Sequence, residues 1–122
     1  MIPVYVEVAG DDAGRLKAAL EGVFSSAGFR TSDIKMERYV FKASAHFTRR
    51  DTDSSVQCNY SVEGGLSDAN MGETLVPLSA SGREASTDFA NAKNRAIRAM
   101  EGKIKKEFAD SFNRFLSNIA AY

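Results

Sequence analysis

Apolar side chains recur every three or four residues through the last third of this chain. Because an α-helix has about 3.6 residues per turn, this spacing draws one apolar stripe along a single helix. We expect that helix to start between Glu84 and Asp88, with Ser86 or Thr87 as its cap, and to run to about Ala120. The stripe consists of Ile97, Met100, Ile104, Phe108, Phe112, Phe115 and Ile119.

The length of this helix sets a constraint on everything it packs against. Residues 86–120 would span about 52 Å at 1.5 Å per residue, which is more than a strand of about six residues can cover. Gly102 is a position at which the helix could break, since glycine costs about 1 kcal/mol in a helix interior. Otherwise the far end either projects as a subunit contact or folds over another part of the chain, and the spacing fits both.

Two short elements open the chain. Alternating valines over residues 4–8 predict a strand. The next segment, residues 16–27, places its apolar residues on one face of a helix. Asp11 or Asp12 can cap the start of that helix, and Gly28 supplies its C-terminal stop.

Three strands are expected after a link through residues 29–37. Apolar and polar side chains alternate over residues 39–48 and again over residues 56–62, which predicts two strands that each bury one face. The polar turn between them predicts a hairpin. A third strand is expected over residues 73–81, where Pro77 favours an edge position because proline has no backbone N–H.

The order of elements is therefore β-α-β-β-β-α, which predicts an α+β two-layer sandwich with two helices on one face of an antiparallel, or mixed, sheet. The 122 residues suit one domain over 1–122, either excised from a longer protein or its mature part. The predicted core consists of Leu16, Leu20, Tyr39, Phe41, Phe47, Val56, Tyr60, Val62, Ile97, Met100 and Ile104.

Charge and composition limit the partners. Sixteen basic residues balance sixteen acidic ones, which argues against a general polyanion-binding surface. The longest apolar runs fall far short of the roughly 20 residues of a membrane span. The amino terminus has neither a basic start nor an apolar signal core, so we expect a cytosolic chain or one that begins just after a removed targeting segment.

Few residues suggest chemistry. His46 and Cys58 could form a nucleophilic pair, but no orienting third group is identifiable, and their strand positions predict an exposed histidine and a buried structural cysteine. Residues 51–53 lack the later ligands of a calcium loop, so we expect them to form a solvated hairpin tip. The glycines at 64–65 and 82 do not match a phosphate-binding loop, and we expect them to lie in turns. We therefore predict a protein that is not an enzyme and has no metal or cofactor site.

One alternative is a nucleic-acid binder. The α-β-β-β-α order that ends in residues 92–96 resembles the double-stranded RNA-binding domain, in which lysines at the start of the last helix contact phosphates. The corresponding residues 86–90 contain no lysine and one aspartate. A cytosolic nucleic-acid-binding module is thus the second hypothesis, and our main expectation includes no nucleic acid.

A second resemblance covers nearly the whole chain. Residues 37–43 resemble the "adyvl-x-g" strand of envelope lipoprotein domains, and residues 68–74 resemble their "d-x-x-tGe" hairpin. Residues 81–83, followed by Ala92, Ala96, Ala99 and Ile104, are similar to the small-residue start of their closing helix. The group includes the curli secretion component CsgG, the penicillin-binding-protein activator LpoB, LPP-type outer-membrane lipoproteins and the amino-terminal domain of TolB.

This resemblance implies a location in the periplasm or on the periplasmic face of the outer membrane, with a cytoplasmic location as the alternative. It implies a non-catalytic module that binds other envelope proteins or associates with copies of itself. The length of the C-terminal helix makes that helix the expected place of self-association. The residues expected to make such contacts are Phe108, Phe112, Phe115, Ile119 and, on the edge strand, Pro77.

Overall fold

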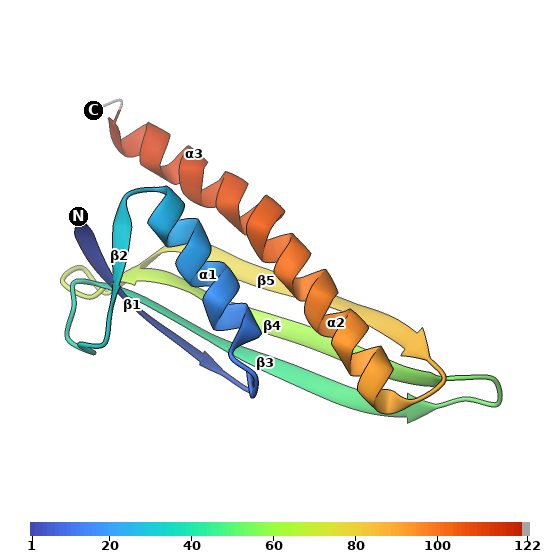
Figure 1. Ribbon diagram of the computed structural model, residues 1–122. Coiled ribbons are helices and arrows are strands. Elements are labelled where there is room, and N and C mark those ends of the chain that lie inside the picture. Colours follow the sequence, from blue (N-terminus) through green and yellow to red (C-terminus); the bar gives the residue numbers. More distant parts are fainter. Residues whose placement is uncertain (121–122) are drawn as a thin grey trace.

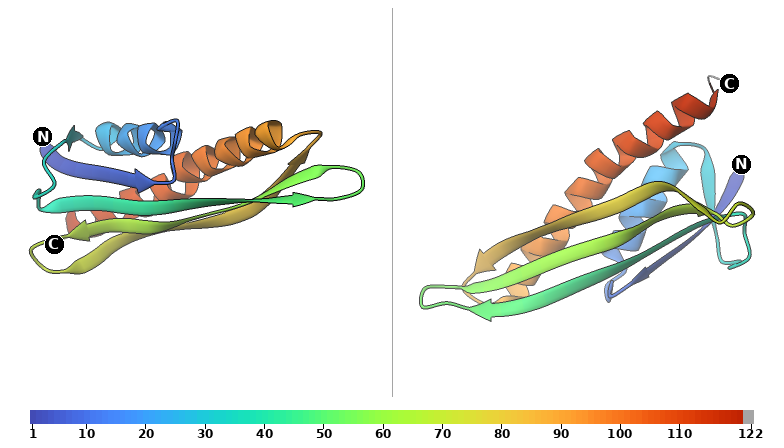
Figure 2. Two further views of the ribbon diagram at one scale, coloured as in Figure 1. Left: turned by 90° about the horizontal axis from the view of Figure 1, so that it is seen from below. Right: turned by 180° about the vertical axis from the view of Figure 1, so that it is seen from behind.

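The fold is an α+β sandwich, as expected, with two helical segments packed on one face of a five-stranded sheet (Figures 1 and 2). A computed structural model describes residues 1–120. The elements are β1 (Ile2–Ala9), α1 (Arg15–Ser26), β2 (Phe29–Ser32), β3 (Tyr39–Asp51), β4 (Val56–Asp68), β5 (Glu73–Ser86), α2 (Phe89–Lys103), the π-helical turn η1 (Ile104–Phe108) and α3 (Ala109–Ala120).

The sheet is mixed and has the strand order β2-β1-β3-β4-β5. Strand β1 runs parallel to both β2 and β3, whereas β3, β4 and β5 form an antiparallel meander. Strand β5 lies at the edge, so the edge position predicted for Pro77 is confirmed. The alternation predicted for β3 and β4 is also confirmed, because their helix-facing side chains are buried. These buried residues are Phe41, Ala43, Ala45, Cys58, Tyr60 and Val62.

Strand β2 is missing from the sequence prediction, which treated residues 29–37 as a link. It has four residues, of which only Phe29 is buried, so it carries no period-two pattern. It pairs in parallel with β1 and places Phe29 beside Ile2.

The prediction that the glycines at 64–65 and 82 are turn residues was wrong, because the strands are longer than expected and contain all three. A Cβ atom at Gly64 would collide with the backbone carbonyl of Lys42, and one at Gly82 would collide with the Tyr60 hydroxyl. These glycines allow neighbouring strands and a large ring to approach closely.

Aspartates cap both helices. Asp11 accepts hydrogen bonds from the backbone N–H groups of Leu16 and Lys17, at 3.1 and 2.9 Å, although Gly14 occupies the N-cap position of α1. The predicted cap of the last helix, Ser86 or Thr87, was wrong. Strand β5 continues through residue 86, and Asp88 caps α2 by accepting from Asn91 N–H at 2.8 Å.

The last helix continues past Gly102 without a break, but one turn, η1, is π-helical. The buried stripe of this helix recurs every four residues, at Met100, Ile104, Phe108 and Phe112. In a straight α-helix each four-residue step turns the stripe by about 40°, so three steps would turn it by about 120°. A π-helical turn rotates less per residue and keeps the stripe on the sheet side.

The far half of this helix folds back onto its own chain. The ring of Phe24 on α1 contacts Phe108 and Phe112 edge to face, with centroid distances of 6.0 and 5.1 Å. Phe24 also packs on Phe41 of β3, at 5.8 Å, and on Phe29 of β2, at 6.2 Å. These five rings, called the aromatic cluster below, join both helices to the sheet.

Replacement of Phe112 by alanine is expected to lower the free energy of unfolding by about 3–5 kcal/mol, because this ring is completely buried. The measurement is urea unfolding followed by circular dichroism. Phe115→Ala is the matched control, since its ring is only partly buried against the core and should cost clearly less. Equal losses for the two variants would contradict the packing described here.

Candidate interaction surfaces

The five residues predicted to make partner contacts do not form one surface. Phe108 is 3% exposed and Phe112 is fully buried, so both rings are already used by the core of their own chain. Phe115 is partly buried, whereas Ile119 and Pro77 are exposed. Of these three positions, Phe115 and Ile119 share helix α3, whereas Pro77 lies on β5. Partner contacts by these exposed positions remain a prediction.

A groove of about 600 Å³ runs between α1 and the long C-terminal helix, on the outer side of the helical layer. We call it the interhelical groove. Several side chains in its wall are small, and in α1 they recur every four residues at Ala18, Gly22 and Ser26. A Cβ atom added at Gly22 would meet no atom within 4 Å. The remaining lining residues are Arg15, Ala19, Val23, Glu101, Lys105, Ala109 and Asn113.

Arg15 connects the two helices that form the groove. Its guanidinium donates to Asn94 Oδ1 at 2.6 Å and forms an ion pair with Glu101, both on α2. These contacts reach from one helix to the other and help to hold their separation. Lys105 also lines the groove, and within residues 1–120 it forms no ion pair. The groove therefore combines small apolar walls with one uncompensated positive charge.

The β5 edge is shielded over part of its length. Lys103 Nζ donates to the backbone carbonyl of Ser81, and Arg95 Nη1 to that of Ala85, both at 2.9 Å. Pro77 removes one N–H from the same strand. Cationic side chains and proline are common means of preventing edge-to-edge strand pairing. This edge is consequently a weaker candidate for partner binding than the groove.

His46 and Cys58 lie on opposite faces of the sheet and do not form a pair. Cys58 is buried under the helices, and burial raises the pKa of its thiol. His46 is exposed on the face that no helix covers. Its cross-strand neighbour is Ser61, whereas Cys58 pairs with Arg49. The two predictions, an exposed histidine and a buried cysteine, are confirmed.

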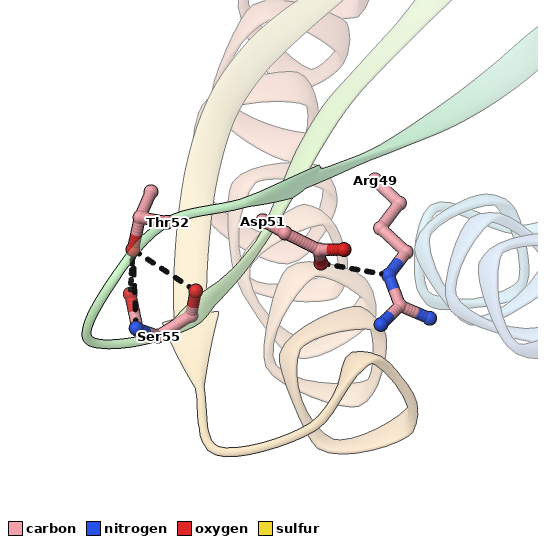
Figure 3. A network of polar contacts seen from close by, with 4 residues as sticks. All are labelled: Arg49, Asp51, Thr52 and Ser55. Carbon is pink, nitrogen blue, oxygen red and sulfur yellow. Dashed lines mark hydrogen bonds and ion pairs between the residues drawn. The ribbon is translucent and has the colours of Figure 1, made fainter.

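The β3–β4 hairpin tip is held by local polar contacts (Figure 3). Arg49 Nε donates to Asp51 Oδ1 at 2.9 Å, so this carboxylate already has a cationic partner. Thr52 Oγ1 donates to the Ser55 carbonyl at 2.9 Å and accepts from Ser55 N–H at 3.1 Å. The prediction of a solvated tip is confirmed. Within the described residues, no group of three or more His, Cys, Asp or Glu side chains could hold a metal ion.

A buried carboxylate joins two loops at the other end of the sheet. Asp68, at the end of β4, accepts from Arg38 Nε and Nη2 at 3.1 and 3.0 Å and from Asn70 N–H at 2.9 Å. The backbone N–H of Ala69 donates to the Arg38 carbonyl at 2.7 Å. Hydrogen bonding from Arg38 lowers the pKa of Asp68. These contacts fix the β2–β3 loop against the β4–β5 turn.

Comparison with known proteins shows a shared fold. No protein-family model matches this sequence, and no curated protein sequence matches it. A minor lipoprotein from Acinetobacter baumannii has a TM-score of 0.53 at 14% identity, over 97% of this chain and 92% of that one. A lipoprotein from Neisseria meningitidis has a TM-score of 0.53 at 15% identity, over 85% and 98%. A Xanthomonas campestris protein has a TM-score of 0.59 at 8% identity, over 99% and 88%.

This chain therefore has a fold found in bacterial lipoproteins, which agrees in outline with the resemblance seen in the sequence. The finer grouping with CsgG, LpoB and TolB remains a prediction. Among residues 1–120, the helices are too short or too polar to be candidate membrane spans.

The sequence reasoning missed the interhelical groove and the Arg38–Asp68 contact. Arg15 and Glu101 are 86 residues apart, and nothing in their local patterns indicates that they meet. The spacing of Ala18, Gly22 and Ser26 was the available signal, but small residues at helical intervals also occur in tightly packed cores.

Asp68 is expected to make the folding stability of the protein fall at low pH. Because its pKa is lowered in the folded state, its contribution is present above the unfolded pKa of about 4 and is lost as pH falls through the folded value. Asp68→Asn should therefore have a lower Tm than the unmodified protein at pH 7, and the difference should shrink below about pH 4. Thermal unfolding from pH 2 to pH 7 measures this. A difference in Tm that stays constant over that range would contradict the assignment.

Proposed function

We propose that this chain is a non-catalytic, protein-binding domain of a bacterial envelope protein, and that its interhelical groove receives a helix of another envelope protein. The proposed location is the periplasm or the periplasmic face of the outer membrane. The observation that carries the binding function is the open groove of about 600 Å³ between two helices that are fixed on a common core. The fold that this chain shares with bacterial lipoproteins supports the location.

The shape of the groove favours a helix as its occupant. Small side chains on the wall formed by α1 allow the backbone of a third element to approach closely. The stripe from Ala18 to Ser26 spans eight residue steps, or about 12 Å, which corresponds to slightly more than two turns of a packed helix. A short amphipathic helix that fills a groove with its apolar face is a common mode of peptide recognition.

Charge in the groove indicates one further property of the partner. Glu101 is neutralised by Arg15, whereas Lys105 lacks an acidic partner among the described residues. An acidic side chain on the partner helix, placed beside Lys105, would complement this charge. Such a contact would contribute more to orientation and specificity than to affinity.

Gly22→Trp is expected to block the groove without unfolding the protein, because space is open around this position. Gly102→Trp is the matched control. Gly102 is also an exposed helical glycine with no atom within 4 Å of an added Cβ, and it does not line the groove. We expect a protein captured from an envelope extract by the unmodified chain to be retained by Gly102→Trp and to be reduced at least about tenfold by Gly22→Trp.

Photo-crosslinking from position 18 then identifies the segment of the captured protein that lies in the groove. A crosslink to a helix of another protein is the expected result. Equal capture by both tryptophan variants would contradict the groove as the binding site. Light scattering provides a further test, since a dimer that Gly22→Trp dissociates would show that the occupant is a second copy and not another protein.

A further inference from the structure

The exposed large apolar side chains of the described surface gather at one end of this elongated molecule. They lie on the amino-terminal strand, the β2–β3 loop, the β4–β5 turn and the carboxyl end of the last helix. All three views place these four segments at the same end, opposite the β3–β4 hairpin tip (Figures 1 and 2). We call this surface the apolar end, and its residues are Met1, Ile2, Ile34, Met36, Met71 and Ile119.

The apolar end has a fixed support. The β2–β3 loop carries Ile34 and Met36, and the β4–β5 turn carries Met71. The Arg38–Asp68 contact and the hydrogen bond from Ala69 N–H to the Arg38 carbonyl tie this loop to this turn. The two segments that carry these three residues are therefore held against each other, although they come from separate parts of the chain.

The opposite end has a different character. The β3–β4 tip consists of Asp51, Thr52, Asp53, Ser54 and Ser55 and is held by polar contacts. The exposed large apolar side chains of the described residues thus lie at one end of the long axis, and the hairpin tip at the other end is polar. Exposed apolar side chains that gather in one region are typical of interaction surfaces. Single exposed apolar side chains scattered over a surface are common in soluble proteins and need no such explanation.

The geometry points to a phospholipid bilayer as the partner: we propose that the apolar end inserts shallowly into the interfacial region of a membrane. Met36 is 92% exposed and Met1 88% exposed, so these side chains protrude singly from separate segments. A rigid protein partner would need a separate pocket for each side chain. A bilayer interface is deformable and can accept them without matching pockets.

The charges at this end fit the interfacial region. Lys35 stands between Ile34 and Met36, and its aliphatic stem can follow them while its ammonium group remains at the level of the headgroups. The neighbouring charges in residues 33–38 are Asp33, Glu37 and Arg38, so the loop carries no excess of either sign. Binding should accordingly depend on apolar insertion and only weakly on anionic lipid or salt.

This inference rests on the envelope location in the proposed function and adds an orientation to it. With the apolar end on the bilayer, the hairpin tip points away from the membrane (Figure 1). The interhelical groove lies along the side of the molecule, where a second protein can reach it.

Flotation with phosphatidylcholine vesicles tests the proposal. We expect the unmodified protein to float with the vesicles, and Ile34→Ser combined with Met36→Ser to reduce the bound fraction about tenfold. Thermal unfolding should be unchanged, because both side chains are exposed. Replacing part of the phosphatidylcholine by phosphatidylglycerol should change binding little. Failure of the unmodified protein to float overturns the proposal.

A second variant controls for the total number of exposed apolar residues. Asp53→Ile combined with Ser54→Met, added to the serine double variant, places two such residues at the polar end. We expect flotation to stay low, because these residues cannot reach the bilayer together with the remaining apolar end. Recovery of flotation would show that vesicle binding does not depend on where the exposed apolar residues lie on the molecule, and it would overturn the proposed orientation.

A spectroscopic readout locates the contact directly. Cys58 is fully buried, so a polarity-sensitive fluorophore can be attached selectively to Met36→Cys. Its emission should shift to the blue when vesicles are added, and no shift would contradict insertion. A dimer without lipid that the serine double variant dissociates would instead assign the apolar end to a second copy. Loss of vesicle binding with intact groove-dependent capture would overturn this inference alone and leave the proposed function standing.

Discussion

The structure depends on the packing around the ring of Phe24. This ring lies where the two helical segments, β2 and β3 meet, and it contacts one phenylalanine of each strand and two of the last helix. Phe108 and Phe112 both stand at 85° to it, which is the edge-to-face geometry that aromatic quadrupoles favour. The two rings are separated by one helical turn and are nearly parallel to each other, at 4°. The far half of the helix is therefore held by α1 and β2, which resolves the mismatch between helix and strand length within one chain.

The π-helical turn connects this packing to the candidate binding site. Because each residue of η1 rotates the helix by less than an α-helical residue does, Phe108 and Phe112 stay on the inner side after Ile104. The π-helical turn also determines which residues of the last helix face α1 along the interhelical groove. Lys105, Ala109 and Asn113 consequently lie along the groove in line with Glu101. Core packing and groove lining are two results of one helical irregularity, and π-helical turns are often found near functional sites.

The sequence predicts those parts of this fold that repeat a pattern. Strands β3 and β4 bury one face each, so their alternation is clear, and the apolar face of α1 is equally clear. Strand β2 has one buried residue in four and offers no pattern. Gly64 is needed because another backbone lies where its Cβ would be, and that depends on strand pairing that no local rule contains. The fold class is therefore accessible from the sequence, whereas close approaches between elements are not.

The candidate site is less predictable for a related reason. An apolar stripe that packs on its own chain has the same periodicity as one that packs on a partner, so spacing alone cannot separate Phe108 and Phe112 from Ile119. What separates them is the position of Phe24, 84 residues before Phe108 in the sequence. The cluster takes up the apolar surface that the long helix would otherwise expose, and the exposed apolar side chains that remain stand at the end of the molecule. The proposed interaction surfaces of this chain are thus set by what the aromatic cluster covers and what it leaves uncovered.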